Sequence, residues 1–392
     1  MRILYFYRVP LPSARADAIQ IVQSCSAMAR AGARIALHVE ETGGRSGQEI
    51  LSWYGVEPFA GEEAGSLTFT PLGSHWSWPF LSLRTRDVFR LPAGERGTLF
   101  VREVRRYVPG LMKRARRAGL RTIFEAHNVS TSLALEKQGL PDSLPAAEGR
   151  ARERHRLERE ILSLTDALVC TQRETLDQLK PLLAPETPTI ILGNGTRLAP
   201  AAPMAGKDID VLYCGSLKEW KGVDTLVYAM QSLHPWVLTI VGPGTDQDLA
   251  RLKALALALG VRERVRILPP VSPSEVWGLY GRARVGVIPL PSGASVEARS
   301  FTSPLKLFEM LAAGLPIVAS RLPSLTEYIE NDREALLVDP DDPRFLAFGI
   351  RRILTEETLS ARLSEAARRR AAAFTWDERG RRLVEFARGL RS

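Results

Sequence analysis

One segment near the C-terminus constrains the fold more than any other, because it combines a helix that has defined ends with a buried strand. Ser303 is a favoured N-cap residue, and Pro304 suits the first helical position, where a backbone N–H has no partner within the helix. Apolar residues then recur at helical spacing, and Gly314 supplies the left-handed residue that commonly ends a helix. With the apolar run at 315–320, this order predicts a helix that packs on a parallel sheet and leads into a buried strand.

Two charged residues at the start of this helix indicate a site for a phosphorylated ligand. Lys306 and Glu309 share one face of the helix near its N-terminus. That end offers unpaired N–H groups and a positive dipole, which favour a bound phosphate. Since a lysine there opposes the dipole, we expect a bound diphosphate to offset the repulsion and Glu309 to accept hydrogen bonds from sugar hydroxyls. An ordinary amphipathic helix on a sheet remains the alternative.

A second segment predicts a turn that holds a diphosphate. The strand expected at 210–214 is followed by Gly215, and Lys221 and Gly222 then open a helix. A glycine turn after a strand, with a lysine at the start of the next helix, suits the binding of phosphate groups by backbone N–H. Gly242 ends the next expected strand in a similar turn.

The run SPLKLFEMLAAGLPIVAS at 303–320 resembles the donor-binding signature of GT-B glycosyltransferases, in particular glycosyltransferase family 4. The resemblance extends in order over nearly the whole chain, and its motifs are concentrated in the C-terminal half. It implies an α/β fold of two Rossmann-like domains that face each other across a cleft. The implied domains are an acceptor-binding domain, 1–195 with a returning C-terminal helix at 375–392, and a nucleotide-sugar-binding domain, 196–374.

The resemblance also implies roles for individual residues. In that family a Glu of the signature helix binds the ribose of the donor, which carries over to Glu309. An Arg usually follows the first glycine of the turn, but this position is Ser216, so we expect Lys306 to supply a second cation beside Lys221. The base usually docks near the position of Val271. The expected donor-binding residues are Gly215, Ser216, Lys221, Gly242, Val271, Ser303, Pro304, Leu305, Lys306 and Glu309.

The loop before the signature helix departs from the family pattern. The first Glu of the family motif would fall at Phe301, so the carboxylate that normally meets the transferred sugar is missing. Glu297 is the nearest acid; it either substitutes from the loop or is a solvated side chain. The identity of the donor sugar is therefore left open.

The N-terminal half carries two further candidates. His127 follows the strand expected at 121–125, at the carboxyl end where doubly wound sheets bind ligands, and the family often has a donor-contacting His near this point. The alternative is a loop histidine that caps backbone. Arg15 lies in a loop after the first strand and either reaches an anion or is solvated, and Asp17 has the residue type of an N-cap. The expected catalytic residues are His127, Lys221, Lys306 and Glu309.

Composition and charge narrow the class of protein. A chain of 392 residues can bury two full cores, and its three separated cysteines offer neither a disulfide framework nor a zinc spacing. With no signal peptide and no apolar run long enough to span a membrane, we expect a cytoplasmic protein. The net charge of +9 favours anionic partners, but no nucleic-acid-binding motif is present.

Aromatic and basic residues in the N-terminal half leave a membrane contact open. Trp76 and Trp78 lie near arginines, and a basic helix is expected at 102–117. Such residues suit peripheral contact with an anionic membrane at its inner face. The alternative is that the tryptophans belong to the core and the arginines to a solvated face.

The predicted function is that of a hexosyltransferase which moves a sugar, with retention of configuration, from a nucleotide-diphosphate donor to an acceptor hydroxyl. Lipid-linked, glycan and small-molecule acceptors all stay open, and cell-envelope or polysaccharide synthesis is the expected setting. Because lysines and helix N-termini stabilise the diphosphate, neither a metal nor another cofactor is expected. Two alternatives remain: a sugar-nucleotide epimerase of the same fold, and an inactive nucleotide-sugar-binding protein.

Overall fold

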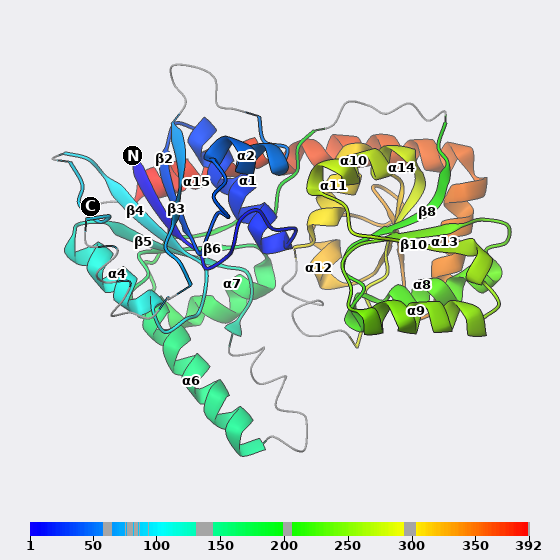
Figure 1. Cartoon of the computed structure of the whole chain (residues 1–392), viewed down its shortest axis with the longest axis horizontal. Coiled ribbons are helices and arrows are strands. Elements are labelled where there is room, and N and C mark those ends of the chain that lie inside the picture. Colours follow the sequence, from blue (N-terminus) through cyan, green and yellow to red (C-terminus); the bar gives the residue numbers. More distant parts are fainter. Residues whose placement is uncertain are drawn as a thin grey trace. The chain divides into compact units, whose positions relative to one another are not determined.

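The chain is described by a computed structural model (Figure 1). The described residues are 1–57, 65–74, 76, 81, 85, 87–92, 94–130, 144–198, 206–293 and 303–390, of which 144–151 are described by their backbone alone. The chain divides into two compact units: Met1–Asn194 with Trp376–Ser392, and Gly195–Thr375. These limits differ by one residue from the domain limits expected from the sequence.

The first unit is built on a parallel sheet. Among its described residues, seven strands pair in the order β3-β2-β1-β4-β5-β6-β7, and every pair is parallel. The order reverses between β1 and β4, so ligands are expected outside the carboxyl ends of these two strands. The strands are β1 (Arg2–Phe6), β2 (Arg34–Val39), β3 (Ser66–Pro71), β4 (Gly97–Val101), β5 (Arg121–Ala126), β6 (Ala167–Cys170) and β7 (Thr189–Ile191).

Helices cover both faces of this sheet (Figure 1), which explains why its central strands are buried along nearly their whole length. One face packs against α1, α2 and α15 in a continuous hydrophobic core. The helices α4, α6 and α7 lie on the other side. The helices are α1 (Ala16–Arg30), α2 (Gly47–Trp53), α4 (Val108–Arg117), α6 (Leu144–Ser163), α7 (Arg173–Leu179), the 3₁₀ helix η3 (Lys180–Leu182) and α15 (Trp376–Gly389).

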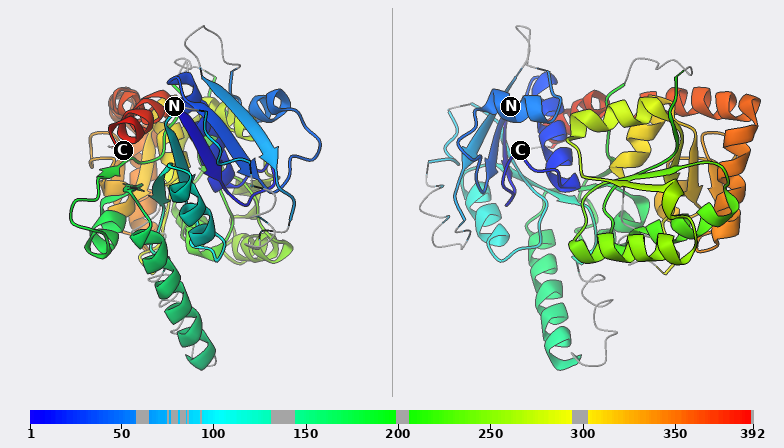
Figure 2. Two further views of the ribbon diagram at one scale, coloured as in Figure 1. Left: turned by 90° about the vertical axis from the view of Figure 1, so that its left-hand side faces the viewer. Right: turned by 45° about the vertical axis from the view of Figure 1, so that its right-hand side comes forward.

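The last helix returns to the first unit, as expected from the sequence. Helix α15 packs along α1 (Figure 2), and Arg30 of α1 pairs with Asp377 at 2.6 Å. The two helices approach closely at Gly380, where an added Cβ would lie 2.4 Å from the carbonyl carbon of Ala27. Glycine at this position therefore lets the returning helix reach the core of the first unit.

The second unit repeats the same plan. Its described residues form a six-stranded sheet in the order β10-β9-β8-β11-β12-β13, again with every pair parallel. The strand order reverses between β8 and β11, which marks the expected ligand position of this unit. The strands are β8 (Ile209–Cys214), β9 (Leu238–Val241), β10 (Val265–Leu268), β11 (Ala283–Ile288), β12 (Ile317–Ser320) and β13 (Leu336–Val338).

Two helical layers enclose this second sheet (Figure 1). Helices α10, α11 and α14 share one core with its strands, and α8, α9 and α13 share the other. Helix α10 begins with a capping box, because the Ser272 side chain accepts from Glu275 N–H and Glu275 accepts from Ser272 N–H. The helices are α8 (Val223–Ala229), α9 (Asp246–Ala258), α10 (Pro273–Arg282), α11 (Leu305–Ala313), α12 (Pro323–Thr326), α13 (Pro343–Thr355), α14 (Glu357–Ala371), and the 3₁₀ helices η4 (Glu219–Lys221), η5 (Met230–Ser232), η6 (Arg262–Arg264) and η8 (Ala372–Phe374).

Three expected helix starts are wrong. Helix α11 begins at Leu305 with an extended Pro304 as its N-cap, so Ser303 lies one residue outside. Helix α1 begins at Ala16, which places Asp17 inside the first turn, where its carboxylate accepts from Tyr7 and from Ala18 N–H. The basic helix α4 begins only at Val108. At α11 and α1 the capping residue has no side-chain hydrogen bond to the helix, so the N-cap preferences of Ser and Asp did not decide these starts.

Candidate functional site

Two glycine turns lie at the carboxyl ends of β8 and β9 in the second unit. Gly215 (φ 148°) and Gly242 (φ 151°) both adopt backbone conformations that other residues rarely take. An added Cβ at Gly242 would lie only 2.0 Å from the carbonyl oxygen of Gly215, so the two turns pack backbone against backbone. The two turns lie at the carboxyl ends of β8 and β9, where ligands are expected in sheets of this kind.

The ammonium of Lys306 lies next to the Gly215 turn. An added Cβ at Gly215 would come within 2.5 Å of Lys306 Nζ, and the same Nζ lies 4.1 Å from the ring centroid of Tyr213. Helix α11 therefore directs its first-turn lysine at the turn that follows β8. The expected role of Lys306 as a second cation beside Lys221 stays a prediction.

The surroundings of Lys306 disfavour its charged form. Burial, together with the like charge of Lys221, lowers the pKa of Lys306 to about 7. Among the described residues, no carboxylate lies within ion-pair distance of Lys306. Lys221 ends η4, where its Nζ lies 3.7 Å from the ring centroid of Trp220. The structure thus brings two lysines of the sequence prediction into one positive region.

Glu309 lies one turn further along α11 and is held by a tyrosine. The hydroxyl of Tyr280 donates to Glu309 Oε2 at 3.0 Å. Burial raises the pKa of Glu309, although this hydrogen bond and the positive charges of Arg197 and Lys306 oppose the rise. The guanidinium carbon of Arg197 in turn lies 4.6 Å from the ring centroid of Trp277, which is on the same helix as Tyr280. The carboxylate is therefore fixed in position and partly desolvated, as a group that orients hydroxyls would be.

The other expected donor-binding residues have less specific surroundings. The Ser216 carbonyl accepts from the hydroxyl of Tyr213 at 2.7 Å. Val271 is partly buried against the core, and Ser303 and Pro304 are buried just before α11. Leu305 opens the helix. Glu297 and Phe301 lie outside the described residues.

The acidic pair at the start of β8 does not form a metal site. Asp208 pairs with Arg282 at 2.5 Å, and Asp210 pairs with Arg284 at 3.0 Å and accepts from Val237 N–H. Within the described residues, no group of His, Cys, Asp and Glu is arranged to hold a metal ion. These aspartates therefore have structural partners.

In the first unit, His127 follows β5 and belongs to a buried polar cluster. Its Nε2 lies 2.9 Å from Oε1 of Glu125, a carboxylate with no exposed surface. Burial and the positive charge of Arg102 lower the pKa of His127 to about 4, although Glu125 acts in the opposite direction. His127 is therefore a neutral imidazole at physiological pH, and its side chain is 18% exposed.

Arg15 is not a free cation. Its guanidinium pairs with Asp17 at 2.5 Å and donates to the same carboxylate through Nε. The pair lies at the start of α1 and is part of a chain of contacts that includes Tyr7. Contact of Arg15 with an anion would require this pair to open.

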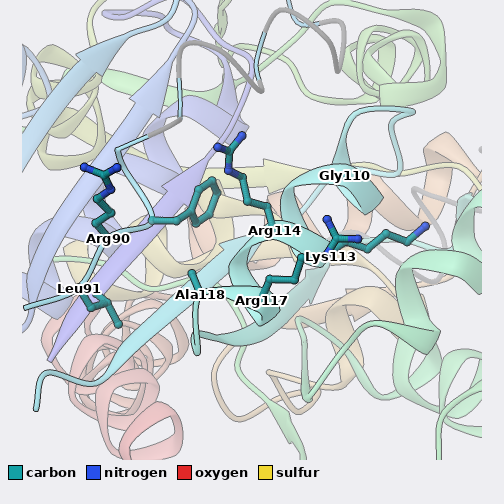
Figure 3. A pocket seen from close by; sticks show the side chains of 8 residues that line it. Arg90, Leu91, Gly110, Lys113, Arg114, Arg117 and Ala118 are labelled. Atoms are coloured by element: carbon teal, nitrogen blue, oxygen red, sulfur yellow. The ribbon is translucent and has the colours of Figure 1, made fainter. Parts of the chain in front are cut away.

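A basic hollow of about 810 Å³ lies elsewhere on the first unit, beside α4. Arg90 stands on one side, and Lys113, Arg114 and Arg117 of α4 stand on the other (Figure 3). Phe89, Leu91, Gly110 and Ala118 complete its lining.

Of the two tryptophans expected near a membrane, Trp78 lies outside the described residues. Trp76 is 5% exposed and donates to the Gly73 carbonyl at 2.7 Å, so it belongs to the core. None of the described helices has the length and apolar character needed to cross a membrane.

Comparison with known proteins agrees with this arrangement. Residues 196–370 match the model of the family "Glycosyl transferases group 1". This match covers less than half of the chain. The matched segment coincides with the second unit, which holds Lys221, Lys306 and Glu309. It supports the expected resemblance to GT-B glycosyltransferases.

Several curated relatives are similar over part of their length. The D-inositol 3-phosphate glycosyltransferase of Xylanimonas cellulosilytica is 28% identical over 274 residues, which are 64% of this chain and 63% of that protein. Its counterpart in Acidothermus cellulolyticus is 34% identical over 178 residues, 43% and 38% of the two chains. The glycogen synthase of Mycobacterium tuberculosis is 30% identical over 239 residues, 58% and 55% of the two chains. The chain therefore matches less than two thirds of the length of each.

Solved structures resemble the whole chain. The sucrose-phosphate synthase of Thermosynechococcus elongatus has a TM-score of 0.74 at 20% identity, over 99% of this chain and 98% of that one. Anabaena Alr3699/HepE, solved in complex with UDP and glucose, has a TM-score of 0.73 at 14% identity over 100% of both chains. WaaG, a glycosyltransferase involved in lipopolysaccharide biosynthesis, has a TM-score of 0.67 at 17% identity, covering 99% of this chain. The expected α/β fold of two Rossmann-like domains, the GT-B fold, is confirmed.

Sequence reasoning missed three residues of this region. Tyr280 holds Glu309, Tyr213 lies against Lys306, and Arg197 contributes positive charge near Glu309. No local motif singles them out, because each meets its partner only through the tertiary fold. The one usable signal was the position of Tyr213 near the end of β8, two residues before Gly215.

Proposed function

We propose that the protein is a glycosyltransferase that takes a nucleoside diphosphate sugar as donor and transfers the sugar to an acceptor hydroxyl with retention of configuration. One observation carries this proposal. The Lys306 ammonium lies over the Gly215 turn, partly buried, beside the like charge of Lys221 and without a described carboxylate partner. Such an arrangement is costly in the absence of an anion and becomes favourable when a diphosphate binds.

The proposed chemistry follows from these charges. Negative charge develops on the diphosphate as the glycosidic bond breaks, and two ammonium groups with the backbone N–H groups of the glycine turn would stabilise it. Glu309, held by Tyr280, would accept hydrogen bonds from the ribose hydroxyls. The departing phosphate would take the proton of the acceptor hydroxyl. This supply of positive charge makes a metal ion unnecessary, which activity in the presence of a chelator would test.

The donor and acceptor belong to the proposal as well. UDP-sugars are the first donors to test, because the similar HepE structure was solved with UDP and glucose. Acceptors that contain inositol phosphate deserve early trials, since several relatives are named D-inositol 3-phosphate glycosyltransferases. Glycan and lipid-linked acceptors follow, and a role in cell-envelope or polysaccharide synthesis would fit the latter.

Two lysine variants test the assignment. Lys306→Ala and Lys221→Ala should each lose sugar transfer while circular dichroism and thermal melting show a folded protein. Lys218→Ala is the matched control, because Lys218 lies in the same loop but is exposed. Full activity in both site variants would refute the proposal. Incubation of the donor without an acceptor separates transfer from epimerisation, since an epimerase would form an isomeric donor.

We also propose peripheral contact with anionic membrane through the basic hollow beside α4. Arg90 and Arg117 are exposed there, and the hollow has apolar side chains between its cations. Flotation with anionic liposomes at low salt should show binding by the wild type and reduced binding by Arg117→Glu. Arg116→Glu is the control on the same helix, because Arg116 does not line the hollow. Equal flotation of both variants, or none by the wild type, would contradict this contact.

A further inference from the structure

Glu125 is the centre of a buried polar cluster in the first unit. It has no exposed surface and accepts hydrogen bonds from four side chains that come from different parts of the chain. The donors are Tyr5 on β1 (2.7 Å), Gln20 on α1 (2.9 Å), His127 after β5 (2.9 Å) and Arg379 on α15 (2.5 Å).

The state of Glu125 is decided by the cations around it. Burial alone would raise the pKa of Glu125, but the charge of Arg379, the hydrogen bond from His127 and the charge of Arg102 together lower this pKa well below the ordinary value. Glu125 is therefore a carboxylate, which can only accept hydrogen bonds. It follows that Nε2 of His127, at 2.9 Å from Oε1 of Glu125, carries a proton.

Burial and the guanidinium groups of Arg102 and Arg379 keep His127 from gaining a second proton. The groups that act on it are Arg102, which follows β4, Glu125 on β5 and Arg379 on α15. Tyr5 and Gln20 are the uncharged members of the cluster, and Cys25 of α1 is a buried thiol beside Glu125. With two guanidinium groups and one carboxylate, the surroundings carry net positive charge. A neutral imidazole with its proton on Nε2 leaves Nδ1 as a hydrogen-bond acceptor.

Burying the guanidinium of Arg379 carries a considerable desolvation penalty. Its side chain is 3% exposed and its only hydrogen bond among the described residues is to Glu125. Its Nε and Nη1 atoms are buried without a hydrogen-bond partner in the described structure. An apolar residue could fill this space between α15 and the sheet without that desolvation cost. Packing of the returning helix therefore does not explain why a guanidinium lies here.

We propose that Arg379 is a positioning residue, which acts through Glu125 to hold His127 as the neutral Nε2–H tautomer, with Nδ1 as its hydrogen-bond acceptor. The inference rests on the proposed function, because it takes His127 as a residue that takes part in sugar transfer. It adds a role for the last helix. Helix α15 of the first unit supplies this guanidinium from a position 254 residues away from Glu125 in the sequence.

Nuclear magnetic resonance of ¹⁵N-histidine-labelled wild-type protein tests this inference without any assay of activity. The chain has five histidines, and a His127→Gln variant assigns the signal of His127. We expect the neutral Nε2–H tautomer at pH 7, and no charged imidazole until the pH falls below about 5. An Nδ1–H tautomer, or an ordinary titration near pH 6.5, would overturn the inference even if sugar transfer occurs.

Three variants on α15 complete the test. In Arg379→Gln the Glu125–His127 pair loses a cation, so the neutral Nε2–H form should be lost at a higher pH than in the wild type. Arg379→Lys should restore it, and Arg381→Gln should change nothing, because Arg381 is exposed and pairs with Glu378 and Glu385. An unchanged His127 signal in a folded Arg379→Gln variant would refute the role of Arg379.

The kinetic expectation separates positioning from simple stability. In Arg379→Gln, kcat should fall by about tenfold or more, because His127 would no longer be held in one tautomer and orientation during the chemical step. Donor affinity should stay within about twofold, because the diphosphate is held by the second unit. If no donor and acceptor pair gives turnover in the wild type while the His127 tautomer is as expected, the proposed function fails and the assignment of Arg379 to the state of His127 stands.

Discussion

Raising the pH should weaken donor binding through Lys306. The pKa of this lysine is lowered to about 7 in the ligand-free protein by burial and by Lys221. The negative charge of a bound diphosphate offsets the effects of burial and of Lys221, so the pKa in the complex returns toward the ordinary value of a lysine. The protein therefore takes up a proton when the donor binds. The free energy of donor binding becomes less favourable as the pH rises above 7.

The size of this effect follows from the pKa of Lys306. With a value of about 7, about half of the free molecules carry the ammonium at pH 7, and about one in a hundred carries it at pH 9. Affinity should therefore fall roughly fifty-fold between these two pH values, which corresponds to ~2.3 kcal/mol. At pH 7, binding should take up about half a proton per site.

Isothermal titration calorimetry in buffers of different ionisation enthalpy measures both quantities. A nucleoside diphosphate sugar is the proper ligand, because its diphosphate keeps a constant charge over this range. Lys306→Arg is the control, since a guanidinium stays charged and its binding should be independent of pH. Wild-type affinity that is constant from pH 7 to pH 9, with no proton uptake, would refute the argument that Lys306 is partly neutral and binds the diphosphate.

Three further predictions concern the second unit. Lys306→Met should raise the thermal stability of the ligand-free protein at pH 7, by up to about 4 kcal/mol, while abolishing donor binding. The folded pKa of Lys306 is lowered, so the penalty that this variant removes is full below about pH 7, shrinks as the pH rises from 7 toward the ordinary pKa of a lysine, and is absent above it. Gly242→Ala should lower the melting temperature and weaken donor binding, because its Cβ would lie 2.0 Å from the Gly215 carbonyl oxygen; unchanged melting would contradict the close packing of the two turns. Tyr280→Phe should weaken donor affinity by about fivefold, because Glu309 loses the hydrogen bond that holds it. Calorimetry checks this value, and wild-type affinity would show that Tyr280 does not position Glu309.

The order of strands and helices could be predicted from the sequence because each element carries local signals. Gly314 has the left-handed conformation expected of it, with φ 63°, and α11 and β12 follow one another as the apolar pattern predicts. The start of α11 could not be predicted as well. A favoured capping residue, Ser303, lies one position too early, because the extended backbone of Pro304 delays the helix.

Some residues of the candidate site could be predicted from the sequence, and others could not. Lys221, Lys306 and Gly215 could be found because they lie at turns and helix starts, where chain order alone places them near a ligand. Tyr280 and Arg379 could not, since each acts through a partner that is distant in the sequence: 29 residues for Tyr280 and Glu309, and 254 for Arg379 and Glu125. The state of His127 likewise depends on burial and on charges from several elements, which no local pattern records.

The most direct test of the central claim is a crystal structure of the protein with a bound nucleoside diphosphate such as UDP. We predict that the diphosphate lies over the Gly215 turn, with the Nζ atoms of Lys221 and Lys306 within about 3.5 Å of its oxygens and Glu309 at the ribose. A diphosphate bound elsewhere, or bound at this turn with both lysines directed away from it, would contradict the account.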